Sequence, residues 1–316
     1  MISVIIPVHN GTATLARCLD ALNRSLYRDF ECLVADDGST DGSAALAEKS
    51  GAQVLRTKDR KGPAHARNQA AQAARGDVLL FIDADVCVAP DSLARIASAF
   101  DSDATLDALI GSYDDSPGEP DFLSQYKNLL HCFVHQQAKR RASTFWTGCG
   151  AIRRPVFQAS GGFDERYTRP RIEDIELGAR LLRAGRGIEL DPALTVQHLK
   201  RWTFLGLLES DIRDRAIPWT QLMLRERHMP NDLNVQSSQR FSVVLVYLAL
   251  LLAALYWPAS VVAVAIVVGL NHRFYSFLAG RRGWLFALRA VPLHLLYFIY
   301  SGAAFLAGCA LALLVS

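Results

Sequence analysis

The last quarter of this chain lacks charged side chains almost completely. Residues 241–316 contain four arginines but no lysine, aspartate or glutamate, whereas the 316-residue chain carries 34 basic and 31 acidic side chains. Residues 1–240 therefore hold 30 basic and 31 acidic residues, a net charge of −1. This distribution excludes an intrinsically disordered chain and a strongly basic nucleic-acid-binding protein, so no nucleic-acid partner is expected. It indicates a globular part followed by a segment suited to lipid.

Two short-range signals are also missing. The six cysteines form no CxxC pair and have no histidine at metal-site spacing, which argues against a zinc module or a disulfide scaffold. The first residues, from Met1 to Pro7, do not show the charged and then apolar pattern of a signal peptide. We therefore expect the globular part to stay in the cytoplasm with its thiols reduced.

Strand and helix patterns alternate along the first eighty residues. Short apolar runs predict buried strands over Ser3–Val8, Cys32–Ala35, Ala52–Arg56 and Asp77–Ile82. Between them, apolar residues at helical spacing predict helices over 15–26, with Thr12 or Thr14 as the cap, over 43–49 and over 64–74. This alternation is typical of an α/β fold, a mostly parallel sheet with helices on both faces.

Polar residues cluster where three of these strands end, and ligands of such sheets bind at that edge. The clusters are Pro7-Val8-His9-Asn10-Gly11, Asp36-Asp37-Gly38-Ser39-Thr40-Asp41-Gly42 and Asp83-Ala84-Asp85. Each alone reads as a turn or a helix cap. However, two carboxylates that close an apolar strand repel each other unless a cation or hydrogen-bond donors hold them. Oxygen ligands of this kind suit Mg²⁺ or Mn²⁺, which usually bring phosphate oxygens with them.

The ordered set of motifs resembles the family 2 glycosyltransferases. The matching blocks, over roughly residues 1–200, are Val-Ile-Ile-Pro-Val-His-Asn (4–10), Asp-Asp-Gly-Ser-Thr-Asp-Gly (36–42), Ala-Arg-Asn-Gln-Ala (66–70), Asp-Ala-Asp (83–85), Gly-Gly-Phe-Asp-Glu (161–165) and Glu-Asp-Ile-Glu (173–176). The resemblance implies a GT-A fold, Rossmann-like and mostly parallel, and a nucleotide-diphosphate-sugar donor.

The resemblance also implies roles for single residues on the donor side. Asp37 would bind the base, while Pro7, His9 and Asn10 would shape the nucleotide floor. Arg67 would lie near the nucleotide or diphosphate, although its spacing alone equally fits a solvated helix face. Asp83 would meet the ribose or the metal, and Asp85 would be the direct metal ligand that helps neutralise the leaving diphosphate.

On the acceptor side, the resemblance implies that Asp174 is the general base of an inverting transfer, with Glu173 as a neighbour that raises its pKa. Acidic residues here also suit the first turn of a helix. Asp164, after Gly162, would order its loop and bind sugar hydroxyls. His198 would complete the metal shell or, equally, be a packed histidine.

The segment after residue 196 also resembles the Gln-x-x-Arg-Trp motif of processive family members. One extra residue separates Gln197 from Arg201 and Trp202, so processivity is not predicted. Lys200 and Arg201 would neutralise a diphosphate or pair with a lipid phosphate.

The remaining residues predict a membrane region. Residues 203–228 alternate apolar residues with arginines, which is typical of an amphipathic helix at the headgroups or packed on the domain. The apolar run over 241–270 is too long for one upright span. The arginines of 271–282 would stay on the cytoplasmic side if the chain formed a hairpin near Pro258, a surface segment over 274–278 and a last span over 290–315. A tilted two-helix anchor is the alternative.

These observations predict a catalytic domain over 1–200, an interfacial segment over 201–240 and a transmembrane region of two or three helices over 241–316. The leading hypothesis is an inner-membrane, multi-pass glycosyltransferase, able to form homo-oligomers, that uses a lipid-linked or cell-envelope glycan acceptor. A nucleotidyltransferase is the first alternative, although no glycine-rich, lysine-containing phosphate loop lies near the N-terminus. An inactive scaffold of a glycan-export complex is the second, although every expected acid is present.

Overall fold

The computed structural model describes residues 1–315, which form two compact units. The first unit comprises residues 1–119 and 138–201, and the second comprises 120–137 and 202 onwards. The sequence did not indicate that residues 120–137 would join the C-terminal part. The domain boundaries drawn from the sequence after residues 200 and 240 remain predictions.

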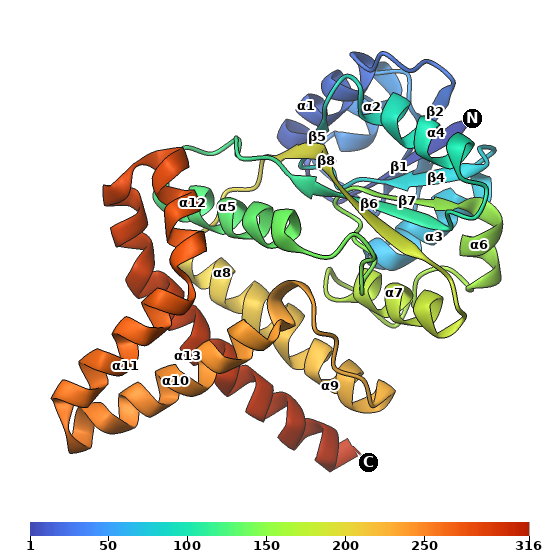
Figure 1. Ribbon diagram of the computed structural model, residues 1–316. Helices are drawn as coiled ribbons and strands as arrows, with labels where there is room; N and C mark the ends of the chain where they lie inside the picture. Colours follow the sequence, from blue (N-terminus) through green and yellow to red (C-terminus); the bar gives the residue numbers. More distant parts are fainter. Residues whose placement is uncertain (316) are drawn as a thin grey trace. The chain divides into compact units, whose positions relative to one another are not determined.

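The first unit is a helix-covered sheet (Figure 1). Its elements are β1 (Ile2–Val8), α1 (Thr12–Asn23), β2 (Phe30–Asp36), α2 (Ser43–Lys49), β3 (Gln53–Arg56), α3 (Pro63–Ala73), β4 (Val78–Phe81), β5 (Val86–Val88), α4 (Ser92–Ser102), β6 (Ala108–Tyr113), β7 (Gly150–Arg153), α6 (Arg154–Ala159), α7 (Glu173–Arg183) and β8 (Ile188–His198). The four predicted strands and the helices over 43–49 and 64–74 are confirmed to within two residues.

The eight strands run in the order β3-β2-β1-β4-β7-β6-β8-β5. Strands β1 to β4 are parallel to one another, with Val8 beside Asp36 and Asp36 beside Arg56, so their carboxyl ends share one edge. Strand β7 runs antiparallel to both β4 and β6. Strand β8 is parallel to β6, while β5 is antiparallel to β8. The expected mostly parallel α/β sheet is therefore confirmed, and the structure adds that it is mixed, since β5 and β7 run antiparallel to their neighbours.

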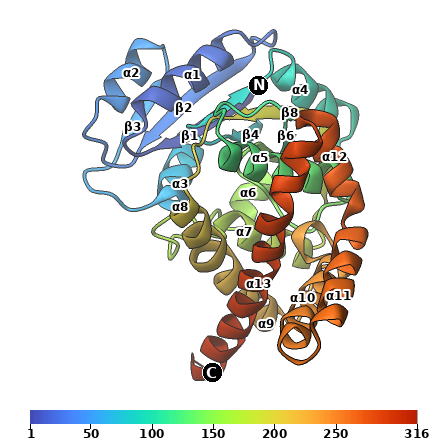
Figure 2. The same cartoon turned by 90° about the vertical axis from the view of Figure 1, so that its left-hand side faces the viewer.

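Both faces of this sheet are covered, which explains why its central strands are apolar throughout. Helices α3, α6 and α7 lie on one face, and α1, α2 and α4 lie on the other (Figures 1 and 2). On the first face, Phe81 packs at the centre of an aromatic group, with its ring 5.0 Å from that of Phe163 and 5.2 Å from that of Phe157. This packing ties the loop over 161–165 to the end of β4.

The start of α1 differs from the expectation. Neither Thr12 nor Thr14 caps the helix, because Gly11 is the N-cap and Thr12 is already helical. The amide of Thr12 instead donates to Oδ2 of Asp41, 3.0 Å away in the loop after β2, so a carboxylate from a neighbouring segment does the work of the cap. Leu26, the last position of the predicted apolar period, lies beyond the helix and is exposed.

The second unit is helical throughout its regular structure. Its elements are α5 (Phe122–Gln137), α8 (Phe204–Glu209), a π-helix over Ser210–Ala216, α9 (Ile217–Glu226), a 3₁₀ turn over Leu233–Val235, α10 (Ser237–Leu255), α11 (Trp257–Leu270), α12 (His272–Arg282) and α13 (Trp284–Val315). Among the described residues, α10 and α13 are long and apolar enough to cross a membrane, and α11 with α12, bent by 65°, form a third candidate.

Helices α10 and α11 form an antiparallel hairpin that turns at Tyr256, close to the predicted Pro258 (Figure 2). Nδ2 of Asn271 donates to Oγ of Ser242 at 2.9 Å, and Oγ of Ser260 donates to the carbonyl oxygen of Ala249 at 2.8 Å. The second bond joins residues that are closer to the turn, and closer to each other in the sequence, than the first, as expected of two helices that form a hairpin. Residues 274–278 belong to α12, whose apolar side is buried.

Candidate active site

The candidate site lies at the shared carboxyl edge of β1, β2 and β4, where the predicted polar clusters come together. Pro7 stands inside β1 opposite Ala35 of β2, so it shapes the strand end itself. Asn10 follows with a positive φ of 52°, a conformation that asparagine tolerates better than most residues. Its Oδ1 accepts a hydrogen bond from the amide of Thr40 at 2.8 Å, which joins the loops after β1 and β2. Nδ1 of His9 lies 2.8 Å from the carbonyl oxygen of Asp37.

Asp37 is buried and its carboxylate holds the segment before α3. Oδ1 accepts from the amide of Lys61 at 2.8 Å and from Oγ1 of Thr57 at 3.2 Å. Oδ2 accepts from the amide of Gly62 at 2.7 Å. Gly62 has a φ of 101°, and a Cβ there would lie 2.4 Å from the backbone of Thr168, so this close approach requires glycine. Asp37 therefore fixes the segment between β3 and α3 beside the carboxyl end of β2.

Arg67 joins three of the motifs. This side chain of α3 is 4% exposed, its Nη2 donates to Oδ1 of Asp83 at 2.7 Å, and its Nη1 donates to Oε1 of Glu173 at 2.8 Å. Arg67 is therefore not the solvated helix residue that its spacing equally allowed. Burial raises the pKa of Asp83 against the opposing charge of Arg67, and the neighbouring Asp85 and Glu173 raise it further.

Asp85 and His198 form the pair best suited to a divalent cation. The antiparallel pairing of β5 and β8 sets Val86 opposite His198, which brings Nε2 of His198 to 3.6 Å from Oδ2 of Asp85. The His198 ring is buried and stacks on Tyr113, with the centroids 4.3 Å apart. Burial raises the pKa of Asp85, but His198 and Lys200 outweigh it and leave this pKa below its ordinary value.

We tested whether these donors fit a bound metal. Ligand atoms around Mg²⁺ or Mn²⁺, bound at about 2.1 Å, lie roughly 3 Å apart when adjacent, so the Asp85–His198 spacing needs only a small adjustment. A carboxylate with an imidazole is a donor set that Mn²⁺ accepts. Within residues 1–315, no three histidine, cysteine, aspartate or glutamate side chains are grouped as a metal site. Asp83, the third predicted ligand, is directed to Arg67 instead.

Glu173 and Asp174 start α7 and face different partners. Glu173 is buried, and besides Arg67 it accepts a hydrogen bond from the amide of Arg171 at 2.8 Å. Asp174 is half-buried, and its Oδ2 lies 3.3 Å from the amide of Thr147 and 3.4 Å from the Thr147 hydroxyl. Because Arg67 balances the charge of Glu173, the two acids are electrostatically distinct.

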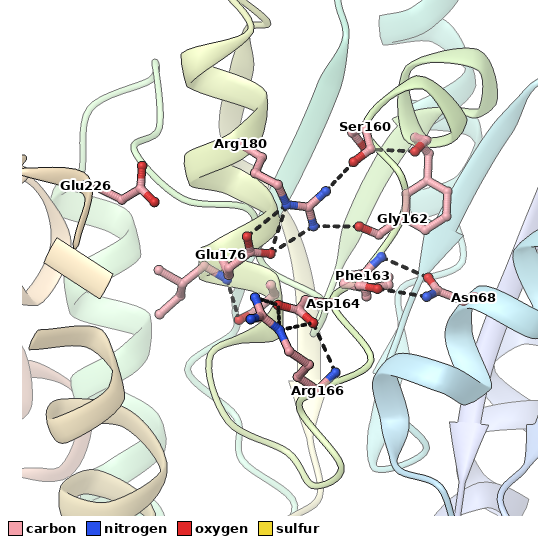
Figure 3. A network of polar contacts seen from close by, with 12 residues as sticks. Asn68, Ser160, Gly162, Phe163, Asp164, Arg166, Glu176, Arg180 and Glu226 are labelled. Atoms are coloured by element: carbon pink, nitrogen blue, oxygen red, sulfur yellow. Dashed lines mark hydrogen bonds and ion pairs between the residues drawn. The ribbon is translucent and has the colours of Figure 1, made fainter. Parts of the chain in front are cut away.

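The loop over 161–165 is fixed by two residues that the sequence analysis did not assign (Figure 3). Asn68 exchanges hydrogen bonds with the backbone of Phe163, accepting at 2.9 Å and donating at 2.8 Å, and it donates to Glu165 at 2.9 Å. Arg180 of α7 donates to Glu176 at 2.9 Å, to the carbonyl oxygen of Gly162 at 2.6 Å and to that of Ser160. The motifs at 66–70 and 173–176 thus hold the loop between them.

Inside this loop the predicted residues have structural partners. Gly162 has a φ of 71°, and a Cβ there would lie 2.6 Å from Oδ1 of Asn68. Asp164 accepts hydrogen bonds from the guanidinium of Arg166, from Nη2 at 2.7 Å and from Nε at 3.0 Å, and these bonds lower the pKa of Asp164. These bonds join two residues of the loop, and the predicted roles of Asp164 in ordering it and in binding sugar remain predictions.

The residues after β8 divide between the two units. Lys200 and Arg201 are exposed at the end of the first unit, and the charge of Lys200 is felt at Asp85. Trp202 begins the second unit, where it is buried with Leu207 and Tyr300. Its amide donates to Oγ of Ser124 in α5 at 2.8 Å. The three residues predicted to act together thus lie in different surroundings.

The sequence contains partial evidence for the roles of Asn68 and Arg180. Asn68 follows Arg67 in the motif over 66–70, and membership of that motif is the sequence feature that could have indicated its role. Arg180 follows Glu176 by four residues, the spacing of an ion pair on one helix face. Nothing local in the sequence indicated that Tyr113 would stack on His198.

Comparison with known proteins agrees with this geometry. The sequence model of glycosyl transferase family 2 matches residues 3–161. The chain is 30% identical over 220 residues to validoxylamine A glucosyltransferase of Streptomyces hygroscopicus subsp. jinggangensis, covering 57% of this chain and 51% of that protein. It is 33% identical over 121 residues to poly(ribitol-phosphate) beta-glucosyltransferase of Bacillus spizizenii, covering 35% of this chain and 19% of that protein. The chain thus spans about half, or less, of these curated relatives.

Two solved structures share the fold over nearly the whole chain. A mannosyltransferase from Pyrobaculum calidifontis, in complex with GDP-Man and Mn²⁺, superposes with a TM-score of 0.64 at 18% identity, covering 96% of this chain and 86% of that one. Residues 1–349 of TarS from S. aureus superpose with a TM-score of 0.55 at 18% identity, covering 97% and 88%. The GT-A fold implied by the resemblance is confirmed. Since the family model covers residues 3–161 of the 316, this chain belongs to glycosyl transferase family 2.

Proposed function

We propose that this protein is a membrane-anchored glycosyltransferase. It transfers a sugar from a nucleotide-diphosphate-sugar to a lipid-linked or cell-envelope glycan acceptor, with a divalent cation and inversion at the anomeric carbon. The family membership supports the transfer reaction, and relatives solved with UDP-GlcNAc or with GDP-Man and Mn²⁺ support this class of donor and cation. The two candidate spans, or three with the bent pair, support a multi-pass protein of the inner membrane with its catalytic unit in the cytoplasm.

One observation carries this proposal: Arg67 binds Asp83 and Glu173 at 2.7 and 2.8 Å although 16 and 106 residues separate them from it in the chain. Three acidic and basic motifs meet at the sheet edge where ligands of α/β proteins bind. Burying an arginine between two carboxylates costs desolvation energy, which the attraction and the hydrogen bonds between them must offset. Perturbed carboxylates clustered at such an edge are typical of catalytic sites.

The donor is proposed to bind at the ends of β1 and β2. Asp37 would meet the base, while Pro7, His9 and Asn10 would form the floor below it, which the hydrogen bonds between the two loops support. Arg67 is proposed to orient Asp83 toward the ribose. Lys200 and Arg201, both exposed, would neutralise the diphosphate or a lipid phosphate.

A divalent cation would be held by Asp85 with His198, and by Asp83 if it leaves Arg67. When bound, such a cation stabilises negative charge on the leaving diphosphate. The lowered pKa of Asp85 supports this role, because the carboxylate is then charged at neutral pH and ready to bind. Tyr113, stacked on His198, would hold the imidazole in place.

Asp174 is proposed as the general base. Its carboxylate would take the proton of the acceptor hydroxyl while that oxygen forms a bond to the anomeric carbon, whose bond to the diphosphate breaks on the opposite side. One displacement of this kind inverts the configuration. Glu173 would act as its neighbour, and Asp164 with Gly162 would border the sugar. Thr147, at 3.3 Å, supports a fixed orientation of the base.

The acceptor is proposed to reach the site from the membrane, with the amphipathic residues that follow Trp202 at the headgroup level. Two relatives are described as acting on validoxylamine A and on poly(ribitol-phosphate), which are unlike acceptors, so family membership alone does not choose one. The protein is also proposed to be able to form homo-oligomers.

The test uses the full-length protein in detergent with bacterial lipid extract, Mn²⁺ or Mg²⁺, and a panel of radiolabelled nucleotide-sugars. Butanol extraction separates lipid-linked label from the rest. We expect label in butanol with one donor, its loss in Asp174→Asn, and its retention in Asp101→Asn, an exposed aspartate of α4. Release of nucleotide diphosphate without butanol label would move the acceptor to a soluble or polymeric glycan. No turnover with any donor would overturn the proposal and favour an inactive scaffold.

A further inference from the structure

The turn between α12 and α13 collects the positive charge of the membrane region. All four arginines of residues 241–316 lie between positions 273 and 289, and no acidic residue occurs anywhere in those 76 positions. They are Arg273, Arg281, Arg282 and Arg289, and all four are exposed on the second unit. We use the name arginine turn for the three arginines nearest to Gly283 in the sequence, which are Arg281, Arg282 and Arg289.

The packing of α12 directs its charge outward. Phe274, Tyr275 and Leu278 are buried, and they pack against Tyr126 and Leu129 of α5. A short helix with one side committed to the protein core presents its remaining side to the surroundings. Gly283, with a φ of 84°, then ends α12 and lets α13 start in a new direction. Arg281 and Arg282 are therefore the last residues of α12, and Arg289 lies in the second turn of α13.

Large apolar side chains follow the arginines directly and are exposed. Trp284 is 68% exposed, Leu285 is 72% exposed and Leu288 is 65% exposed. Exposed apolar groups beside cationic ones are unfavourable in water but match the boundary between lipid headgroups and acyl chains, where tryptophan is enriched. This juxtaposition indicates that the arginine turn lies at headgroup depth.

Two of the guanidinium groups are held in place by α5. Nε of Arg282 donates to Oε1 of Gln125 at 2.8 Å, and the guanidinium of Arg289 lies 4.5 Å from the ring centre of Phe122. No hydrogen bond or ion pair engages Arg289 within the described residues, so its donors are available while its position is fixed. A pre-oriented guanidinium is suited to the oxygens of a phosphate.

We propose that the arginine turn binds the headgroup phosphates of anionic phospholipids. The occupant is an anionic rather than a zwitterionic lipid because three positive charges gather there in a region without acidic residues. Each basic residue near a membrane surface adds a similar attraction to anionic lipid, so three predict a preference on the order of a hundredfold. The inference rests on the proposed membrane anchoring and is independent of the transfer reaction.

The test uses Trp284 as a reporter in the full-length protein reconstituted into phosphatidylcholine vesicles. A small fraction of brominated phosphatidylglycerol or brominated phosphatidylcholine is included, since bromine quenches a tryptophan in contact with it. The difference between wild type and Trp284→Phe isolates the signal of this residue. We expect quenching of Trp284 by the anionic lipid to exceed that by the zwitterionic lipid several-fold, and salt to reduce the difference.

The combined variant Arg281→Gln, Arg282→Gln, Arg289→Gln should lose this preference. A matched variant with three exposed arginines of the first unit replaced, Arg24→Gln, Arg28→Gln, Arg186→Gln, should keep it. Equal quenching of wild-type Trp284 by both lipids, or an unchanged preference in the turn variant, would overturn the inference. If the turn variant does not fold, quenching of wild-type Trp284 by the two brominated lipids at low and at high salt still tests the inference. Absence of quenching by either lipid would instead contradict the membrane anchoring.

Discussion

Replacement of Arg67 by methionine tests the arrangement on which the candidate site depends. The change keeps an unbranched side chain in α3 but removes the cation between Asp83, 35% exposed, and Glu173, 4% exposed. Breaking a buried ion pair by removing one partner costs about 3–5 kcal/mol, because the other charge stays buried without compensation. We therefore expect the free energy of unfolding to fall by about this amount, which lowers the melting temperature on the order of 10 °C.

A second substitution separates this cause from a simple packing defect. In Arg67→Met with Glu173→Gln, the buried orphan charge is gone, so we expect the double variant to regain about 2 kcal/mol over Arg67→Met alone. Arg56→Met provides the control, because Arg56 and its partner Glu48 are 53% and 57% exposed, and the loss of this pair should cost less than about 1 kcal/mol. The assay is thermal and chemical unfolding in detergent, followed by tryptophan fluorescence.

Two results would refute this reasoning. One is an Arg67→Met protein as stable as the Arg56→Met control. The other is a double variant less stable than Arg67→Met, because the losses would then add as they do for independent contacts. Donor binding by the refolded double variant also separates the two roles of Arg67: if Arg67 contacts the diphosphate directly, restored stability will not restore donor affinity.

Three further outcomes are expected. Asn68→Ala removes both bonds to the backbone of the loop over 161–165 and should lower the free energy of unfolding by about 2–3 kcal/mol, measured by the same unfolding assay, with no effect counting against its clamping role. Lys127→Met and Asp211→Leu each break a buried ion pair with bonds of 2.6 and 2.7 Å, so each alone should cost about 3–5 kcal/mol while the double variant costs less; simple additivity would contradict this. His198→Gln should raise the Mn²⁺ concentration for half-maximal transfer roughly tenfold or more without lowering the melting temperature comparably, and an unchanged Mn²⁺ titration would remove His198 from the cation site.

The elements of the first unit were predictable where local pattern and burial agree. β1 and β4 are apolar because both faces of the sheet are covered, and α2 begins and ends at the predicted residues. Prediction failed at the start of α1, because the acceptor for the Thr12 amide comes from Asp41, a residue of another loop. Local pattern does not report such contacts, since they depend on which loops the sheet brings together.

The membrane part shows the same division. The acid-free composition and the apolar runs were sufficient to predict helices that could span a membrane, and the hairpin near Pro258 followed from length and charge. That α5, which lies between β6 and β7 in the chain, joins these helices was not predictable. Its apolar side matches α12 and α13 only in their folded positions.

The sequence by itself determined the alternating α/β architecture, the acidic strand ends and the lipid-suited tail, because these depend on residue type and spacing along the chain. Tertiary structure alone decided that Arg67 is buried between Asp83 and Glu173, that Asp85 meets His198 across β5 and β8, and that Asn68 holds the loop over 161–165. These contacts join residues 16 to 113 positions apart in the chain. The register of β5 and β8 brings Asp85 to His198, whereas the packing of α3, α7 and Phe163 on one face of the sheet brings the other residues together.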